Sequence, residues 1–351
     1  MRGDPISYPT ITTSNELLEQ RYWSHNLMTY ILPSRLFFYL QPQSKIDAMM
    51  PTMEESNNYH DLVTDQIEVM MQQETKLYSC RDYCKMHGWG PKEARSFAND
   101  RKLMLQWSYN VIDFFNLERE TAGIALCYSD RFLQNETRGR EFLDDTEKYQ
   151  LLCIASLYTA IKIHEPASIT PKAFAEISRD QYTAEELEET EQLLLDTLDW
   201  RVNPPTSLEF VRNYLELLPV GLLDEETKAT AYILARAQTE RALGEYSFVT
   251  VEASKIAFSC VQNGLEVLGF GDNNALYCLA AKMDRDYLYF DQEDLRRQLH
   301  SVITWETSTI EAVSGHTKGS PYGSNLHDTT ERHHLHQNTT PRSVACMFFS
   351  R

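Results

Sequence analysis

A long run of helical periodicity, from Asn99 to about residue 312, constrains the fold of this chain more than any other feature of its sequence. Apolar residues recur at helical spacing through this run, and the alternation typical of strands is almost absent. Within it, the stretch from Leu151 to Ile163 is apolar on nearly all sides and includes small residues such as Ala155. A helix with so little polar surface belongs at the centre of a bundle, where small residues let neighbouring helices approach closely. The pattern therefore predicts an all-α protein.

The predicted helices fall into two sets, separated by Pro204-Pro205, a pair that interrupts a helix. The first set is expected over residues 99–115, 120–134, 145–163, 171–177 and 183–198. The second set is expected over residues 206–217, 224–243, 249–267, 272–282 and 291–312. Asn99 and Thr183 stand at expected N-cap positions. The apolar third helix of the first set has a counterpart about a hundred residues later, so we predict two tandem five-helix bundles.

The flanks of these bundles have a different character. An acidic amphipathic helix is expected from Asp61 to Leu77, whereas both ends of the chain are rich in polar residues and lack a core-forming pattern. The predicted organisation is a disordered N-terminal region over 1–56, an amphipathic helix and linker over 57–98, a first bundle over 99–202, a second bundle over 203–312, and a disordered tail over 313–351.

The charge of the chain bears on its partners. Its formal net charge is −18, and an acidic surface repels both nucleic-acid phosphates and anionic lipid heads. We therefore expect neither nucleic acid nor membrane among its partners. The seven cysteines show no regular spacing, several lie in apolar helical patterns, and the N-terminus has no apolar run of signal-peptide type. These features predict reduced thiols and an intracellular protein, in the nucleus and cytoplasm.

Motifs that would indicate catalysis are missing from the sequence. It has no glycine-rich phosphate loop, nucleophile elbow, zinc-protease motif or protein-kinase signature. The clusters His333-His334-Leu335-His336 and Cys80-x3-Cys84-x2-His87 are too short of ligands to close a metal coordination sphere. We expect no enzyme activity, no cofactor and no metal.

Charged residues within the apolar helices are the most specific signal. They are Arg101, Asp130, Lys162 and Glu191. A single charged residue in a helix usually lies on a solvated face, and that is the simpler interpretation of each one. Together with Trp107, however, their spacing resembles the cyclin box. Arg101 and Trp107 match the first-helix motif of that family, Asp130 the end of its second helix, Lys162 the end of its third, and Glu191 its fifth helix.

The resemblance to cyclins covers residues 60–202 well and residues 203–312 by pattern. It implies tandem cyclin folds and a regulatory subunit that binds and allosterically activates a cyclin-dependent serine/threonine protein kinase, controlling cell-cycle progression. In the family, the pair matched by Lys162 and Glu191 hydrogen-bonds kinase backbone beside the kinase αC helix. The other residues that the resemblance places against the kinase are Tyr149, Thr159, Ile163, Leu195 and Val202.

Two further roles follow from the same resemblance. Arg101 and Asp130 are expected to form a structural ion pair between the first two helices. Breaking one partner of a buried pair costs about 3–5 kcal/mol, because the other charge is left uncompensated. A substrate-docking patch, which would receive kinase substrates or inhibitors, is expected at Leu103, Met104, Trp107 and Gln150.

Alternative functions remain open at this point. The chain could be a transcription-associated cyclin, or a cyclin-fold scaffold that binds partners without regulating a kinase. A general transcription factor of the same fold would bind DNA; it should be basic and carry a zinc ribbon, and this chain has neither property.

Overall fold

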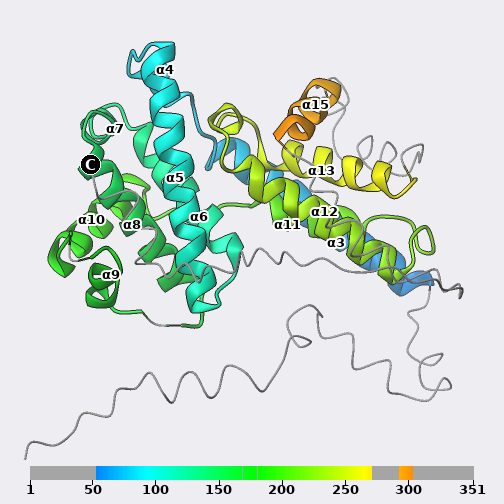
Figure 1. The fold of residues 1–351 in the computed structure, drawn as a ribbon. Coiled ribbons are helices and arrows are strands. Elements are labelled where there is room, and N and C mark those ends of the chain that lie inside the picture. The colour runs from blue at the N-terminus through cyan, green and yellow to red at the C-terminus, as the bar shows by residue number, and fades with distance from the viewer. Residues whose placement is uncertain (1–52, 168, 180, 271–291, 303–351) are drawn as a thin grey trace, which may run out of the picture. The chain divides into compact units, whose positions relative to one another are not determined.

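The computed structural model describes residues 53–167, 169–179, 181–270 and 292–302. Every regular element in these residues is a helix and no strand occurs among them, which confirms the predicted all-α class (Figure 1). The predicted helix over 272–282, most of the predicted disordered N-terminal region and the predicted tail lie outside the described residues.

The first bundle is built around a central helix, as the apolar stretch predicted. Its helices are α5 (Pro91–Phe115), α6 (Arg119–Leu133), α7 (Gly139–Leu143), α8 (Thr146–His164), α9 (Pro171–Ile177) and α10 (Ala184–Thr197). Helix α8 contacts all the others. Ala155 and Ala160 of α8 are completely buried, so their small side chains allow this close approach.

The start of α5 differs from the prediction. The helix begins at Pro91 rather than Asn99, with Gly90 as its N-cap residue, and Asn99 lies within it. Proline suits the first helical position because its fixed φ is already helical and its missing N–H would have had no partner there. The short α7 was not predicted, and neither was α4 (Tyr83–Met86), which precedes α5.

The N-cap predicted at Thr183 is confirmed. The Thr183 side chain accepts a hydrogen bond from the Glu186 amide at 3.1 Å, and the Glu186 carboxylate accepts one from the Thr183 amide at 2.8 Å. This reciprocal capping box sets the start of α10 and therefore the register that places Glu191.

The second bundle is organised around α13. Its described helices are α11 (Ser207–Glu216), α12 (Glu225–Ala242), α13 (Ala253–Val267) and α15 (Gln292–Val302), and α13 contacts each of the others. The prediction began α13 at residue 249, but a 3₁₀ turn, η2 (Tyr246–Phe248), and an extended Glu252 precede it.

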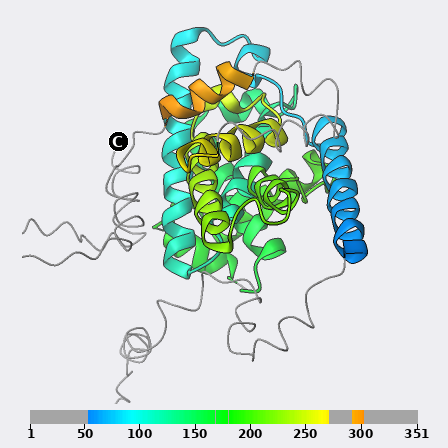
Figure 2. The same cartoon turned by 90° about the vertical axis from the view of Figure 1, so that its right-hand side faces the viewer.

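Helix α3 (Met53–Lys76) is longer than the predicted 61–77 helix, so residues 53–56, predicted to be disordered, are helical. Val63, Ile67 and Met70 are buried in the core of the second bundle, and α3 runs beside α11 (Figures 1 and 2). Two other apolar residues of α3, Leu62 and Val69, are exposed.

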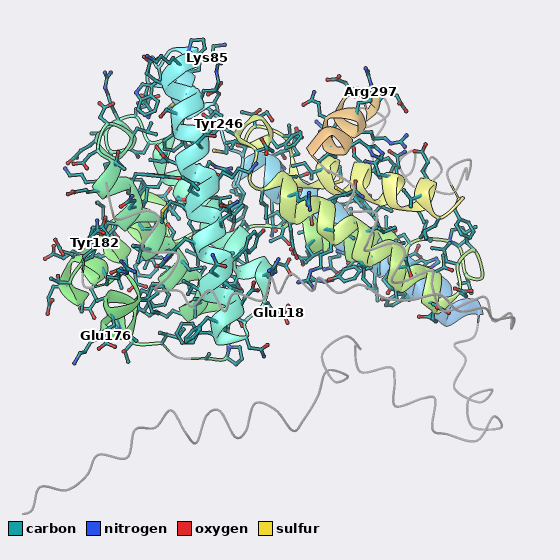
Figure 3. All side chains as sticks on the ribbon, in the orientation of Figure 1. Lys85, Glu118, Glu176, Tyr182, Tyr246 and Arg297 are labelled. Atoms are coloured by element: carbon teal, nitrogen blue, oxygen red, sulfur yellow. The ribbon has the colours of Figure 1, made fainter. Side chains whose placement is uncertain are left out.

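Polar contacts join the two bundles. Lys102 pairs with Glu245 at 2.8 Å, and Arg119 with Glu240 at 3.0 Å. Tyr246 of η2 reaches the first bundle, where its hydroxyl accepts a hydrogen bond from the Cys84 amide at 3.1 Å and donates one to Asp82 at 2.9 Å (Figure 3). These contacts place α4 and the middle of α5 against the segment between α12 and α13, and the start of α6 against α12.

A buried carboxylate near the end of α3 predicts a pH dependence of stability. Glu74 accepts hydrogen bonds from the amide of Ser254 at 3.0 Å and from its hydroxyl, at the start of α13. Burial raises the pKa of Glu74 from 4.5 to about 7. Between pH 4.5 and 7 the folded chain therefore keeps a proton on Glu74 that the unfolded chain releases. The contribution of Glu74 to the free energy of unfolding is full below pH 4.5 and is lost as the pH rises through 7.

We expect the free energy of unfolding to fall by at most about 3 kcal/mol from this group as the pH rises from 5 to 8. Glu74→Gln cannot titrate and should remove that part of the pH dependence. Urea unfolding of both proteins at several pH values measures the difference. Parallel pH profiles for the two proteins would contradict the assignment to Glu74.

None of the helices in the described ranges combines the length and apolar character that a bilayer span requires.

Candidate functional site

The sequence-predicted pair of Lys162 and Glu191 is brought together by the ends of two helices. Helix α8 starts at the N-cap Asp145, whose carboxylate accepts hydrogen bonds from two backbone amides, and it ends at His164, because Glu165 precedes a proline and adopts an extended conformation. Lys162 therefore lies in the last turn of α8, with its Nζ 3.1 and 3.2 Å from the two carboxylate oxygens of Glu191 in α10.

The two members of this pair differ in exposure. The side chain of Lys162 is 56% exposed, whereas that of Glu191 is 10% exposed and also accepts a hydrogen bond from Thr159 Oγ1 at 3.4 Å. Of the two residues, only the lysine is therefore largely open to a partner. The hydrogen bond to Glu191 raises the pKa of Lys162 and keeps it charged. An ammonium has three donors, so Lys162 can offer a hydrogen bond to a partner while it holds Glu191 in place.

The five other predicted kinase-facing residues divide into surface and core. Ile163 is exposed, Val202 is half-buried, and Leu195 is nearly covered. Tyr149 and Thr159 are buried in this chain, which corrects their prediction as partner contacts.

The position of Tyr149 along α8 explains its burial. It lies thirteen residues before Lys162, about 20 Å away at 1.5 Å per residue. Its ring packs against Phe97 of α5, with ring centroids 4.7 Å apart. Thr159, closer to the pair, donates its hydroxyl to the Ala155 carbonyl at 2.8 Å.

The segment after α10 adds a residue that sequence analysis missed. Trp200 is 66% exposed, and both it and Asp199 have left-handed backbone conformations, with φ values of 58° and 50°. Such residues cost about 1–2 kcal/mol each and persist only where their surroundings hold them. The carbonyl of Val202 provides one such anchor, since His164 Nε2 lies 3.0 Å from it and the Tyr128 hydroxyl donates to it. The Trp200 amide also donates to the Leu195 carbonyl at 3.0 Å, so the backbone around Trp200 is held from the end of α10 as far as Val202.

The predicted ion pair of Arg101 and Asp130 is present and buried. Arg101 donates from Nε and Nη2 to the two carboxylate oxygens of Asp130 at 2.9 and 2.7 Å. Its Nη1 donates to the Leu243 carbonyl at 2.6 Å, and the Tyr83 hydroxyl donates to Asp130 at 2.8 Å. Burial opposes the charge of Arg101, but the attraction of Asp130 outweighs it and raises the pKa of the guanidinium. The pair connects α5, α6 and the second bundle.

The predicted docking patch is largely covered in this structure. Met104 and Trp107 are buried in the first core, because they lie on the same face of α5 as Arg101, which faces α6. Leu103 is 38% exposed, and Gln150 is half-buried within hydrogen-bonding distance of the Tyr182 hydroxyl. The Trp107 Nε1 is buried and has no hydrogen-bond partner among the residues that the structure describes. An open apolar patch formed by all four residues is therefore not seen.

No cluster of three or more histidine, cysteine or acidic side chains suited to a metal ion occurs among the residues that the structure describes.

Comparison with known proteins shows a likeness to cyclins. Residues 65–203 match the family model of the cyclin N-terminal domain. G1/S-specific cyclin-D1 of Mus musculus is 26% identical over 230 residues, which cover 62% of this chain and 74% of that protein. G2/mitotic-specific cyclin-B2 of Homo sapiens is 30% identical over 174 residues, covering 50% of this chain and 40% of that protein.

Among solved structures, a viral cyclin from herpesvirus saimiri aligns with a TM-score of 0.47 at 16% identity, covering 71% of this chain and 96% of that chain. The likeness to cyclins depends instead on the matched domain and on the relatives named above. Residues 65–203 of this chain match the cyclin N-terminal domain, and those relatives are cyclins.

Proposed function

We propose that this chain is a cyclin-family regulatory subunit that binds and activates a cyclin-dependent serine/threonine protein kinase, and that it acts in cell-cycle progression. The observation that carries the proposal is the Lys162–Glu191 pair, with Nζ 3.1 Å from the carboxylate, together with two exposed apolar residues: Ile163, the next residue of α8, and Trp200, which follows α10. The names of its relatives, G1/S-specific and G2/mitotic-specific cyclins, support a cell-cycle role without selecting a phase. We also propose that the protein works in the nucleus and cytoplasm, has no catalysis of its own, and meets kinase substrates or inhibitors near Leu103.

We call the surface proposed from Lys162, Glu191, Ile163 and Trp200 the Lys162 face. Its chemistry suits the backbone of a partner helix. Burial of a helix end leaves carbonyl and amide groups without water, and each unmet group costs about 1–3 kcal/mol. Lys162 can donate to a carbonyl, and the remaining lone pairs of Glu191 can accept from an amide. Ile163 and Trp200 supply apolar surface around these polar contacts.

In the proposed mechanism, the face holds the αC helix of the kinase in its inward position. The Lys–Glu pair of the kinase can then form, and its activation loop leaves the active site. A nanomolar complex releases about 12 kcal/mol, which is ample to shift a conformational equilibrium of a few kcal/mol.

Titration of purified cyclin-dependent kinases with the full chain tests the proposal, with phosphorylation of a histone substrate as the readout. We expect saturable activation of at least one kinase. Binding to those kinases without activation would indicate a scaffold, and the absence of both from the whole set would contradict the proposal.

Trp200→Ala is expected to weaken kinase binding about tenfold, because exposed aromatic residues often dominate an interface. It should leave the free energy of unfolding almost unchanged, since the ring is 66% exposed. Calorimetric titration and urea unfolding measure the two effects. The exposed Val220, outside the proposed face, provides a control as Val220→Ala, which should bind as tightly as the wild type. Unchanged affinity of Trp200→Ala would exclude the ring from the interface.

A further inference from the structure

A cavity of about 400 Å³ lies where the end of α3 meets both bundles. Its walls come from the end of α3 and the segment that follows, from α6, from the linker at Pro204-Pro205, from α12, and from the residues that lead into α13. The main apolar side chains in these walls are Ile124, Leu126, Leu243, Phe248, Val251 and Ile256. A mainly apolar cleft of this size at a junction between domains has the properties of a small-molecule site.

One carboxylate in the wall of this cavity differs from the others. The other carboxylates each form an ion pair with an arginine or lysine side chain, with N–O distances of 2.6–3.0 Å. The pairs are Asp130 with Arg101, Glu120 with Arg212, Glu240 with Arg119, Glu245 with Lys102, and Glu252 with Lys255. Glu74 is 6% exposed and forms no ion pair with any residue in the described part of the chain. Its two hydrogen bonds come from the amide and hydroxyl of Ser254.

The surroundings of Glu74 favour a cation. Burial raises its pKa, the two hydrogen bonds from Ser254 lower it, the nearby Glu252 carboxylate raises it, and Lys255, which pairs with Glu252, lowers it by less than Glu252 raises it. A carboxylate can accept about four hydrogen bonds, and Ser254 supplies two. A positive group in the cavity would compensate the buried charge, as Arg101 does for Asp130.

The side chains that line the cavity indicate whether the cation is a metal ion or an organic molecule. A metal ion needs several ligands, and no group of three histidine, cysteine or acidic side chains gathers around a common point in the described ranges. An organic cation needs one counter-ion and apolar contact for the rest of its surface. We propose that this cavity binds a small organic cation, an apolar body with one protonated amine, and that Glu74 is its counter-ion. Lys162, Glu191 and Trp200 do not line this cavity, and the inference does not depend on the proposed function.

Matched probes of one shape test the proposal on the full chain: 4-phenylbutylamine, 4-phenylbutanol and 4-phenylbutyrate, titrated calorimetrically at pH 7.5. We expect the amine to bind at least about tenfold more tightly than the alcohol, and the acid more weakly than either, because a tenfold ratio needs only one modest charge interaction. Glu74→Gln should bind the amine and the alcohol equally. The control Glu136→Gln, an exposed carboxylate outside the cavity wall, should retain the preference for the amine.

Two further measurements separate the site from adventitious binding. Val251→Trp places a large ring in the cavity wall and should abolish binding of both the amine and the alcohol. At pH 6.5 the amine should release protons on binding, because the cation favours the ionised form of Glu74, whereas the alcohol should release none. Calorimetry in two buffers of different ionisation heat measures that release.

The proposal is overturned if the wild-type protein binds the amine and the alcohol equally or binds neither. It is also overturned if amine binding releases no protons, or if folded Glu74→Gln retains the preference for the amine. The wild-type comparisons decide the matter even if a variant does not fold.

Discussion

Replacing Lys162 and Glu191 together by alanine is expected to abolish activation of the partner kinase while leaving the protein folded. The double change is needed because Glu191 is almost covered, so Lys162→Ala alone would leave a buried carboxylate uncompensated. Removing both charges avoids that penalty, and a half-exposed pair of this kind contributes about 1 kcal/mol or less to stability. Histone phosphorylation by the kinase measures activation, and circular dichroism with urea unfolding confirms the fold.

A matched control separates this site from a general loss of charge. Lys172 and Glu176 are exposed on α9, four residues apart, and in the described part of the chain neither forms a hydrogen bond or ion pair with Lys162 or Glu191 (Figure 3 labels Glu176). Lys172→Ala with Glu176→Ala should activate the kinase as the wild type does. Normal activation by a folded Lys162→Ala, Glu191→Ala protein would refute the assignment of the site.

Arg101→Met is expected to lower the free energy of unfolding by about 3–5 kcal/mol. The methionine keeps much of the length of the side chain but leaves Asp130 buried, with Tyr83 as its remaining hydrogen-bond donor. It also removes the donor to the Leu243 carbonyl, which joins the bundles. Because the stability of a folded protein is typically about 5–15 kcal/mol, this single change should approach the limit of folding. Urea unfolding followed by circular dichroism measures the loss.

The neighbouring residue provides the control for Arg101. Lys102 pairs with Glu245, and the two side chains are 49% and 35% exposed. Lys102→Met should therefore cost less than about 1 kcal/mol. If the two variants lost equal stability, the buried pair would not have the structural role proposed for it.

Periodicity predicted which helices form, because burial of an apolar face depends mainly on local spacing. It identified α8 as the central helix, and the Thr183 capping signal placed the start of α10. Periodicity failed at the start of α5. Gly90 and Pro91, which the predicted division places in a linker, are the N-cap residue and the first residue of this helix. The family match over 65–203 likewise extends into α3, which the predicted division assigned to a separate N-terminal segment.

The site could be predicted only in part, for a physical reason. The resemblance paired Lys162 with Glu191, and the structure places them 3.1 Å apart. Exposure depends on which neighbour covers a side chain, and a one-dimensional pattern does not contain that information. Tyr149 and Trp107 are therefore buried where surface roles were predicted. Trp200 was missed because its exposure and left-handed conformation arise in the turn that ends α10, where its amide donates to the Leu195 carbonyl, and apolar spacing does not signal such a turn.

Hydrogen exchange of the chain, alone and bound to the kinase that it co-purifies with, tests the central claim most directly. Mass spectrometry of the purified complex first identifies the kinase. We predict slower exchange in the complex for backbone amides at the end of α8 and in residues 199–203, around Lys162 and Trp200. Unchanged exchange in both segments, with protection confined to the second bundle, would show that the kinase binds elsewhere and would contradict the account.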